Sequence, residues 1–288
     1  MGVVNVTPDS FSDGGTWLDQ DKAIAHGLEL ASQGADIIDV GGESTRPGAQ
    51  RIPVEDELGR VMPVVTALAQ AGVFVSIDTM RAEVARRALS AGARMVNDVS
   101  GGQADPHMVS VIAEASVPYV VTHWRGHSAD MYGPAVYTDV VAEVRSELGR
   151  RLRAVTAAGV DPANIIVDPG LGFAKLAEHS WTLLAHLDQI ARPEGYAEPF
   201  RVLVAASRKG FLGKLLASSD GQPRSFAGSD DATIAVTALA VAAGAWCVRV
   251  HMVPGNLDAV RVAGRWRAEA ERVPAQGNEP TDLPGETG

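Results

Sequence analysis

The sequence predicts an α/β protein built as a single (β/α)8 TIM barrel, and three observations support this fold class. Eight short apolar runs recur along the chain, amphipathic stretches separate most of them, and polar residues gather where the runs end. Alternation of strand and helix eight times over is the pattern of a barrel with a parallel sheet inside and helices outside. A doubly wound open sheet is the alternative that the same alternation allows.

A repeating unit marks four of the predicted strands. In each unit a glycine precedes a mostly apolar run: Gly34 before "ADIIDV", Gly72 before "VFVSID", Gly92 before "ARMVND" and Gly244 before "AWCVRVH". Glycine suits the position just after a helix, where a left-handed backbone costs no Cβ clash. The run itself is typical of a strand that is buried on both faces. A polar residue follows each glycine by five or six positions, at Asp39, Asp78, Asn97 and Arg249.

The elements follow in order along the chain. The eight predicted strands span residues 2–6, 36–41, 73–78, 94–99, 118–123, 164–168, 201–206 and 247–251. Apolar residues that share one face predict helices between them, for example over 20–33 and 81–91. The long gap after the seventh strand predicts an extra helix, with "SSDGQPRSFAGSD" as the linker between two helices. Residues 273–288 have no apolar period, so we expect a barrel over 1–272 and a disordered C-terminal tail.

Composition narrows the class of function. The 288 residues include 35 acidic and 25 Lys/Arg side chains, a formal net charge of −10. This charge argues against an electrostatic grip on nucleic acid or on an anionic membrane surface. The single cysteine, Cys247, excludes an intrachain disulfide. Because no signal peptide precedes the first strand and no apolar run reaches membrane-spanning length, we expect a cytoplasmic protein.

Polar side chains stand at the carboxyl ends of the predicted strands, which meet at one rim of a barrel. Asp78, Asn97 and Asp168 offer acceptors for a heterocycle rich in N–H donors, because a carboxylate can take two parallel N–H groups. Asp39 and Asp98 are interpreted more weakly, since each can simply fix a loop. Cations also follow the strands, and together they would bind anions: Arg46, Arg208, Lys209, Arg249 and His251. A heterocycle that carries phosphates satisfies both groups of side chains.

Several cofactor motifs are missing from the sequence. There is no phosphate-binding Gly-x-x-x-x-Gly-Lys-Ser/Thr loop and no Gly-x-Gly-x-x-Gly fingerprint, so neither usual nucleotide cradle is present. No His-Glu-x-x-His or Cys-x-x-Cys pair suggests zinc. A hard ion such as Mg²⁺, held by substrate phosphates and one or two protein oxygens, remains open.

The motifs at the predicted rim resemble those of the dihydropteroate synthases, a pterin-binding TIM-barrel family. They are "NVTPDSFSDGG" (5–15), "DVGGESTRPGA" (39–49), "SIDT" (76–79), "VNDVSGG" (96–102), "DPGLGFAK" (168–175), "SRKGFLG" (207–213) and "RVH" (249–251). The resemblance runs from Met1 to about Arg267, and "HWR" is similar to the actinobacterial type. One departure is Met252, where the family usually has an aspartate.

The resemblance implies condensation of 7,8-dihydropterin-6-ylmethyl diphosphate with 4-aminobenzoate in folate biosynthesis, with sulfonamides as inhibitors and a homodimer as the assembly. It implies four groups of site residues. The pterin residues are Asp78, Asn97, Asp168 and Lys209; the diphosphate residues are Arg249, His251 and Asn5, with Asn5 also a Mg²⁺ ligand; the 4-aminobenzoate residues are Thr45, Arg46, Pro47, Phe173 and Ser207; and the lid residues are Thr7, Asp9, Phe11 and Ser12. The implied catalytic groups are Lys209, Arg249, His251 and Asp78.

Three other functions stay open at this point. A non-catalytic relative would bind pterin without condensing it, a related barrel presents methyltetrahydrofolate to a corrinoid protein, and a Schiff-base aldolase would use Lys209. The intact motifs around Thr45 and Ser207 favour the synthase. On this assignment, Arg249→Ala is expected to lower turnover with the diphosphate and to spare binding of a plain pterin.

Overall fold

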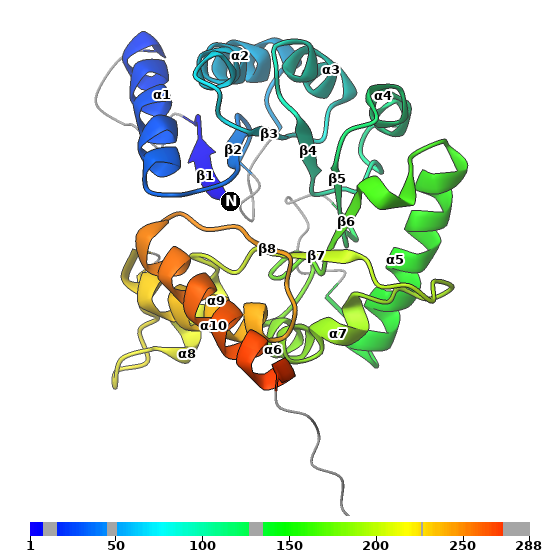
Figure 1. Cartoon of the computed structure of the whole chain (residues 1–288), viewed down its shortest axis with the longest axis vertical. Helices are drawn as coiled ribbons and strands as arrows, with labels where there is room; N and C mark the ends of the chain where they lie inside the picture. Colours follow the sequence, from blue (N-terminus) through cyan, green and yellow to red (C-terminus); the bar gives the residue numbers. More distant parts are fainter. Residues whose placement is uncertain (8–15, 45–50, 127–134, 226, 273–288) are drawn as a thin grey trace, which may run out of the picture.

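The computed structural model describes residues 1–7, 16–44, 51–126, 135–225 and 227–272, and parallel strands form its centre (Figure 1). The strands pair in chain order from β1 to β8. They are β1 (Gly2–Asn5), β2 (Ile38–Gly41), β3 (Val75–Asp78), β4 (Met95–Asp98), β5 (Tyr119–Thr122), β6 (Ile165–Asp168), β7 (Arg201–Val204) and β8 (Cys247–Val248). Gly2 also forms a parallel bridge with Val250 beyond β8. This bridge joins the last strand to the first, so the predicted barrel is confirmed and the open sheet is excluded.

Helices surround the strands (Figure 1). They are α1 (Thr16–Ser32), α2 (Val54–Gln70), α3 (Ala82–Ser90), α4 (Met108–Ala115), α5 (Val140–Ala157), α6 (Ala177–Ala185), α7 (Leu187–Ile190), α8 (Gly210–Leu215), α9 (Asp230–Ala242) and α10 (Pro254–Arg272). The extra helix predicted after the seventh strand is confirmed, because α8 and α9 both lie between β7 and β8. The pair α6 and α7 between β6 and β7 is not predicted by the sequence pattern.

The glycines of the repeating unit end helices as predicted. Gly34, Gly72, Gly92 and Gly244 have φ angles of +100°, +81°, +108° and +95°. After α1, the Gly34 N–H donates to the Ala31 carbonyl at 3.0 Å and the Ala35 N–H donates to the Leu30 carbonyl at 3.1 Å. This pair of hydrogen bonds is a Schellman motif, which needs a left-handed residue at its centre. Each such turn sends the chain directly into the next strand.

The interior of the barrel is apolar at one end and polar at the other. Its apolar end is filled by Met1, Ile37, Met95, Val120, Ile166, Leu203 and Ala205, with Cys247 packed against them. Side chains two residues apart on a strand point to the same side of the sheet. Asp39, Asn97, Asp168 and Arg249 each follow one of these inward residues by two positions, and therefore point into the polar end. A second, larger apolar cluster fills the space between the strands and the outer helices.

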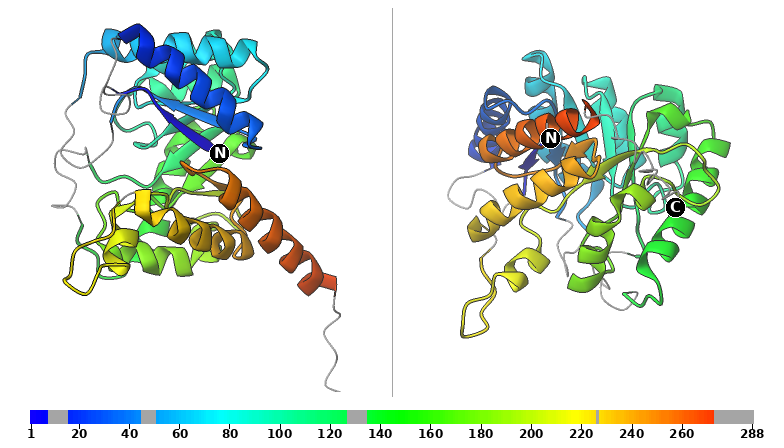
Figure 2. Two further views of the ribbon diagram at one scale, coloured as in Figure 1. Left: turned by 90° about the vertical axis from the view of Figure 1, so that its left-hand side faces the viewer. Right: turned by 60° about the horizontal axis from the view of Figure 1, so that its bottom comes forward.

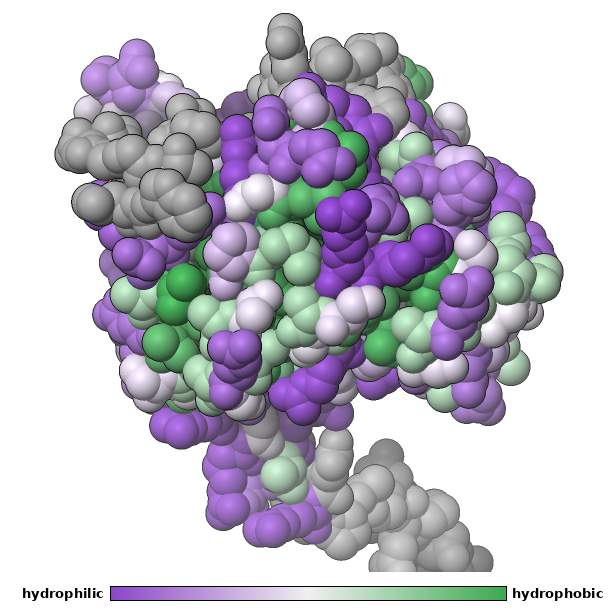
Figure 3. All heavy atoms as spheres, turned by 90° about the horizontal axis from the view of Figure 1, so that it is seen from above, coloured by the Kyte–Doolittle hydropathy of each residue, from purple (hydrophilic) through white to green (hydrophobic). Residues whose placement is uncertain are grey.

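The outer surface is mixed. Seen from above, green apolar side chains lie across the middle of the face, between hydrophilic ones (Figure 3). Residues 216–225, between α8 and α9, project away from the barrel (Figure 2). Among the helices that the structure describes, none has the length and apolar character needed to cross a bilayer.

Candidate active site

Arg249 lies between two carboxylates at the polar end of the barrel. Its Nε donates to Asp39 Oδ2 at 2.6 Å, and its Nη2 donates to Asp78 Oδ2 at 2.7 Å. The Asn97 amide donates to the same Asp39 oxygen at 2.9 Å. These four residues are the ones that follow the glycine in the repeating unit. The barrel thus brings together side chains from β2, β3, β4 and the end of β8.

Asp39 corrects one interpretation from the sequence. Its side chain does not fix a loop, because it is fully buried in the barrel and bonds Asn97 and Arg249. Its second oxygen, Oδ1, is buried without a hydrogen-bond partner among the described residues. A buried carboxylate oxygen without a donor is costly, so this atom is poised to accept an N–H from a ligand. The signal in the sequence was its position in the repeating unit, two residues after Ile37.

Asp98, by contrast, does fix a loop. Its carboxylate accepts hydrogen bonds from the Ser100 N–H at 2.8 Å, the Ser100 hydroxyl at 2.7 Å, the Gly102 N–H at 2.6 Å and the Tyr119 hydroxyl at 2.9 Å. Asp98 follows Val96, which packs in the outer apolar cluster. Its side chain therefore lies on the opposite side of β4 from Asn97.

Burial and neighbouring charges act in opposite directions on the pKa values of Asp78 and Arg249. Burial raises the pKa of Asp78 to about 7, although the Arg249 guanidinium opposes the shift. Burial works against the charge of Arg249 too, but Asp39 and Asp78 hold the pKa of Arg249 above its ordinary value. The guanidinium therefore stays charged, while Asp78 can take up a proton near neutral pH.

Asp168 and Lys209 form a second part of the same site. Burial raises the pKa of Asp168, against the opposing charge of Lys209 and a hydrogen bond from the Gly170 N–H at 2.7 Å. Arg249 also lowers the pKa of Asp168, so Asp168 and Asp78 both face one guanidinium. Burial lowers the pKa of Lys209 to about 8, with Asp168 opposing. The Lys209 amino group donates to the Leu171 carbonyl and lies 4.5 Å from the centre of the Phe173 ring.

Ser207 and His251 lie against each other at the rim. The two side chains are 3.0 Å apart between Oγ and Nδ1, and the His251 backbone N–H donates to the same hydroxyl at 3.2 Å. The next residue, Arg208, has a φ of +58° and makes a two-point ion pair with Asp230 at 3.0 and 2.9 Å. This ion pair ties the loop after β7 to the first turn of α9.

Backbone strain also concentrates here. Ala174 and Arg208 are two of the three non-glycine residues with positive φ in the described part of the chain. Ala174 follows Phe173, and Arg208 stands between Ser207 and Lys209. Such conformations persist where the surrounding structure enforces them, and they cluster at functional sites. We infer that the backbone conformations of Ala174 and Arg208 orient the neighbouring side chains toward the site.

Asn5, the Mg²⁺ ligand that the resemblance implies, offers one amide oxygen at the rim of the barrel. Asn5 is the last residue of β1, partly exposed, and pairs in register with Gly41 of β2. Within the described ranges, no three His, Cys, Asp or Glu side chains gather as a metal-binding group. One amide oxygen is a hard ligand, and Mg²⁺ commonly keeps several waters and binds through substrate phosphates rather than in a cage of protein ligands.

Several predicted site residues lie outside the described residues. They are Asp9, Phe11 and Ser12 of the predicted lid, and Thr45, Arg46 and Pro47 of the predicted aminobenzoate pocket. Thr7, at the start of the predicted lid, is described and partly buried. Of the predicted aminobenzoate pocket, the structure therefore describes Phe173 and Ser207.

Comparisons with known proteins agree with this geometry. The model of the pterin-binding enzyme family matches residues 1–251. The dihydropteroate synthase of Mycobacterium leprae is 54% identical over 267 residues, covering 92% of each protein. Two solved relatives superpose closely. That of Xanthomonas albilineans, in complex with 7,8-dihydropteroate, has a TM-score of 0.79 at 40% identity, over 95% of this chain and 94% of the other. That of Yersinia pestis, in complex with a sulfonamide drug, has a TM-score of 0.84 at 35% identity, over 93% and 94%. The chain therefore belongs to the pterin-binding enzymes, and within them to the dihydropteroate synthases.

Proposed function

We propose that this site condenses 7,8-dihydropterin-6-ylmethyl diphosphate with 4-aminobenzoate, giving 7,8-dihydropteroate and pyrophosphate. Membership of the family supports the transferase reaction in folate biosynthesis, and the geometry supports the roles of individual residues. The observation that carries the proposal is the set of buried acids and cations around Arg249 at one end of the barrel. It favours catalysis because a relative that only binds pterin would not need cations for a leaving pyrophosphate.

The carboxylates and Asn97 would hold the pterin ring. Asp168 and Asp78 can each accept N–H groups of the ring, and the unpartnered Oδ1 of Asp39 adds an acceptor that the sequence motifs did not assign. Lys209 would donate to the ring carbonyl, because it faces Asp168 and Asp78 across the site. Charge-assisted hydrogen bonds of this kind are the strongest that a buried site offers.

The cations would stabilise the departing diphosphate. During the reaction the C–O bond to the diphosphate breaks, a C–N bond to the arylamine forms, and the arylamine gives up one proton. Arg249, His251 and Lys209 would bind the negative charge that develops on the leaving group, and Asn5 would hold Mg²⁺. Bound there, Mg²⁺ would neutralise further charge on the diphosphate. No strong general base is needed, since the arylammonium formed by attack is acidic.

The second substrate would bind beside Phe173 and Ser207, together with Thr45, Arg46 and Pro47. Phe173 offers a flat apolar surface for a benzene ring, and its ring already lies 4.5 Å from the Lys209 amino group. The complex of the Xanthomonas relative with 7,8-dihydropteroate, the product of this condensation, supports the reaction here. The complex of the Yersinia relative with a sulfonamide drug supports sulfonamides as inhibitors. The lid residues that the resemblance implies, Thr7, Asp9, Phe11 and Ser12, would cover the mouth of the barrel when the diphosphate and Mg²⁺ are bound.

The assembly is proposed to be a homodimer in the cytoplasm. Helices α9 and α10 pack against each other and carry large exposed apolar side chains, with Leu239 70%, Val262 66% and Trp266 75% exposed. Apolar groups gathered on neighbouring helices commonly mark a protein interface. Light scattering of the wild type and of Trp266→Glu tests this. The dimer proposal fails if the wild type is monomeric at micromolar concentration.

Pyrophosphate release is the direct test of the reaction. The protein is mixed with the pterin diphosphate, 4-aminobenzoate and Mg²⁺, with and without a sulfonamide. We expect pyrophosphate and dihydropteroate in equal amounts, and inhibition by the sulfonamide that excess 4-aminobenzoate relieves. Lys209→Met should abolish the signal, whereas Lys214→Met, an exposed lysine on α8, should not. Binding of pterin without any condensation would identify a non-catalytic relative instead.

A further inference from the structure

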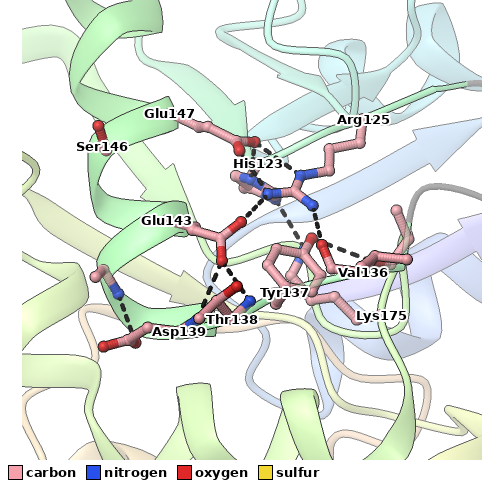
Figure 4. Close-up of polar contacts among 12 residues, drawn as sticks. His123, Arg125, Val136, Tyr137, Thr138, Asp139, Glu143, Ser146, Glu147 and Lys175 are labelled. Atoms are coloured by element: carbon pink, nitrogen blue, oxygen red, sulfur yellow. Dashed lines mark hydrogen bonds and ion pairs between the residues drawn. The ribbon is translucent and has the colours of Figure 1, made fainter.

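His123, Lys175 and Glu147 form a largely buried polar cluster, to which the mechanism above gives no role. Figure 4 shows these three side chains. His123 follows β5 and Lys175 follows the "DPGLGF" motif, and both are only 2% exposed. The Lys175 amino group lies 2.8 Å from His123 Nδ1, and His123 Nε2 lies 2.8 Å from an oxygen of Glu147 on α5. A continuous hydrogen-bonded chain thus leads from the partly exposed Glu147 side chain to a buried amine.

The hydrogen-bond directions in this chain follow from the charges. Burial would raise the pKa of Glu147, but hydrogen bonds from His123 and Arg125 hold it at about 2, so Glu147 is ionised. Burial and the charge of Lys175 lower the pKa of His123 to about 4, so the imidazole is neutral. Nε2 therefore carries the proton and donates to Glu147, which leaves Nδ1 as an acceptor for Lys175.

Arg125 fixes the outer end of the chain. Its Nη2 donates to Glu147 at 2.6 Å and to Glu143 at 2.8 Å, and its guanidinium lies 3.8 Å from the centre of the Tyr137 ring. Glu143 and Glu147 both project from α5 toward this arginine (Figure 4). Because these contacts hold Glu147 in place, they also fix the orientation of the His123 ring. The His123 ring in turn fixes the position of the Lys175 amino group, from which it accepts a hydrogen bond.

Gly170 brings this amine close to Asp168. The Gly170 N–H donates to Asp168 Oδ1 at 2.7 Å, and a Cβ on Gly170 would lie 3.2 Å from the Lys175 amino nitrogen. The same Cβ would stand 2.2 Å from the His123 carbonyl, and Gly170 has a φ of +68°. Only glycine fits at this position, because a Cβ would clash with the His123 carbonyl and the φ angle is positive. The Lys175 charge accordingly lowers the pKa of Asp168, against the effect of burial.

The charged groups around Asp168 and Lys175 determine the pH range in which Lys175 affects Asp168. Asp168 faces the cations Lys209, Lys175 and Arg249. Lys175 faces Asp168, Lys209, Arg125, Glu147 and His123. Burial lowers the pKa of Lys175 to about 7, so the amine is charged below neutral pH and loses its charge above it. Its charge is present in the acidic range, where a buried carboxylate is prone to take up a proton.

We propose that Lys175 is a positioning residue of the pterin site, which His123 and Glu147 hold behind Asp168 so that its ammonium keeps this carboxylate ionised for the ligand. The inference rests on the proposed pterin-binding function. A purely structural lysine would affect binding equally at every pH. Lys175 should instead support pterin binding in acid and become dispensable in alkali.

The test compares pterin affinity across pH in three variants. Lys175→Gln removes the charge but can still donate hydrogen bonds, Lys175→Arg keeps a charge at every pH, and Lys214→Gln is the exposed control. Calorimetry with a plain pterin gives the ratio of variant to wild-type dissociation constants, in which the titration of Asp78 cancels. For Lys175→Gln we expect weaker binding near pH 6, by at most about tenfold, which is the limit that a shift of about one unit in the pKa of Asp168 sets. The ratio should fall to about one near pH 9.

The controls separate charge from folding. Lys175→Arg should bind within about threefold of the wild type near pH 6, since a neighbouring cation is restored. The Michaelis constant for the pterin diphosphate should rise in Lys175→Gln, whereas that for 4-aminobenzoate should not. A ratio that stays constant from pH 6 to 9, or wild-type affinity of Lys175→Gln near pH 6, would overturn the inference.

Two further outcomes keep the inference distinct from the proposed function. If the wild type binds pterin but releases no pyrophosphate, the proposed reaction fails, and the calorimetric ratio still decides the role of Lys175. If Lys175→Gln does not fold by circular dichroism, Glu147→Gln replaces it. Loss of the Glu147 charge makes Lys175 easier to deprotonate, so pterin binding should weaken about threefold near pH 6 and not near pH 9.

Discussion

Arg249 and Asp78 share a hydrogen bond across the interior of the barrel, with 2.7 Å between Nη2 and Oδ2. The family motifs assign these residues to opposite parts of the ligand, Arg249 to the diphosphate and Asp78 to the pterin. In the structure one guanidinium serves both Asp78 and Asp39, so the two parts of the site are electrostatically joined. A change at Arg249 must therefore reach the pterin carboxylates.

This pairing changes the expected behaviour of Arg249→Ala. The sequence alone predicts that plain pterin binding is spared, but without the guanidinium the pKa of Asp78 rises further and the carboxylate is largely protonated at neutral pH. We expect about fivefold weaker binding of a plain pterin at pH 7, because a rise of roughly one unit from a pKa of about 7 reduces the ionised fraction of Asp78 by that factor. Turnover with the diphosphate should fall about a hundredfold or more, because a charge on the leaving group loses its partner.

Calorimetry at pH 7 and pH 9, together with steady-state rates, checks this prediction. The binding defect should narrow at pH 9, where Asp78 ionises even without its partner. Arg150→Ala, on the exposed face of α5, is the matched control and should leave both quantities unchanged. If Arg249→Ala bound plain pterin normally at pH 7, the electrostatic coupling of the two parts would be wrong.

The pH dependence of the wild-type reaction should be bell-shaped. Asp78 must be ionised to accept N–H groups, and its pKa is raised to about 7 by burial, so kcat/KM for the pterin diphosphate should fall about tenfold per pH unit below that value. Lys209 must be charged to bind the ring carbonyl and the anion, and its pKa is lowered to about 8, which sets the alkaline limb. Initial rates of pyrophosphate release between pH 5.5 and 9.5 measure both limbs. A profile that stays flat below pH 6.5 would remove Asp78 from the pterin site.

Asp168→Asn tests the second pterin carboxylate. The substitution keeps the shape of the side chain and removes its charge, so the affinity for a plain pterin should fall by roughly 1.5–3 kcal/mol, the worth of a hydrogen bond to a charged group. Calorimetry at pH 8 measures the change. Asp161→Asn is the control at the opposite end of β6, where Asp161 is exposed and caps the short helix η3 (Pro162–Asn164). Equal affinities of Asp168→Asn and the wild type would show that Asp168 does not touch the ligand.

The architecture could be predicted because its signals are local. The turn glycines and the apolar runs each depend on a few neighbouring residues, and the positive φ angles at Gly34 and Gly92 show that the local rule holds in the folded protein. Strand ends were less accurate. β7 ends at Val204 and β8 at Val248, before the predicted limits of 206 and 251, although Val250 still forms an isolated bridge with Gly2.

The roles of individual acids could not be separated in the same way. Asp39 and Asp98 both end apolar runs, yet Asp39 points into the barrel and Asp98 points toward the outer helices. In a barrel both faces of a strand are apolar, so the sequence shows no alternation that would reveal which side chains face inward. Lys175 was missed for a related reason. Its partners His123 and Glu147 come from different strands and helices, and only the fold brings them together.

Asp98→Ala should lower the stability of the fold and leave the affinity for pterin nearly unchanged. It removes four hydrogen bonds from a buried loop and leaves their donors without an acceptor, so we expect the free energy of unfolding to fall by about 3 kcal/mol. Urea unfolding followed by circular dichroism measures the loss. Tyr119→Phe removes the hydrogen bond of 2.9 Å from the Tyr119 hydroxyl to Asp98 and should cost about 1 kcal/mol.

Pterin affinity distinguishes this role from that of the neighbouring Asn97. Folded Asp98→Ala should bind a plain pterin within about twofold of the wild type, whereas Asn97→Ala should bind about tenfold more weakly, since Asn97 holds Asp39 in the lumen. The difference arises because the two adjacent side chains lie on opposite sides of β4. If folded Asp98→Ala lost pterin binding as strongly as Asn97→Ala, the assignment of Asp98 to the loop alone would be refuted.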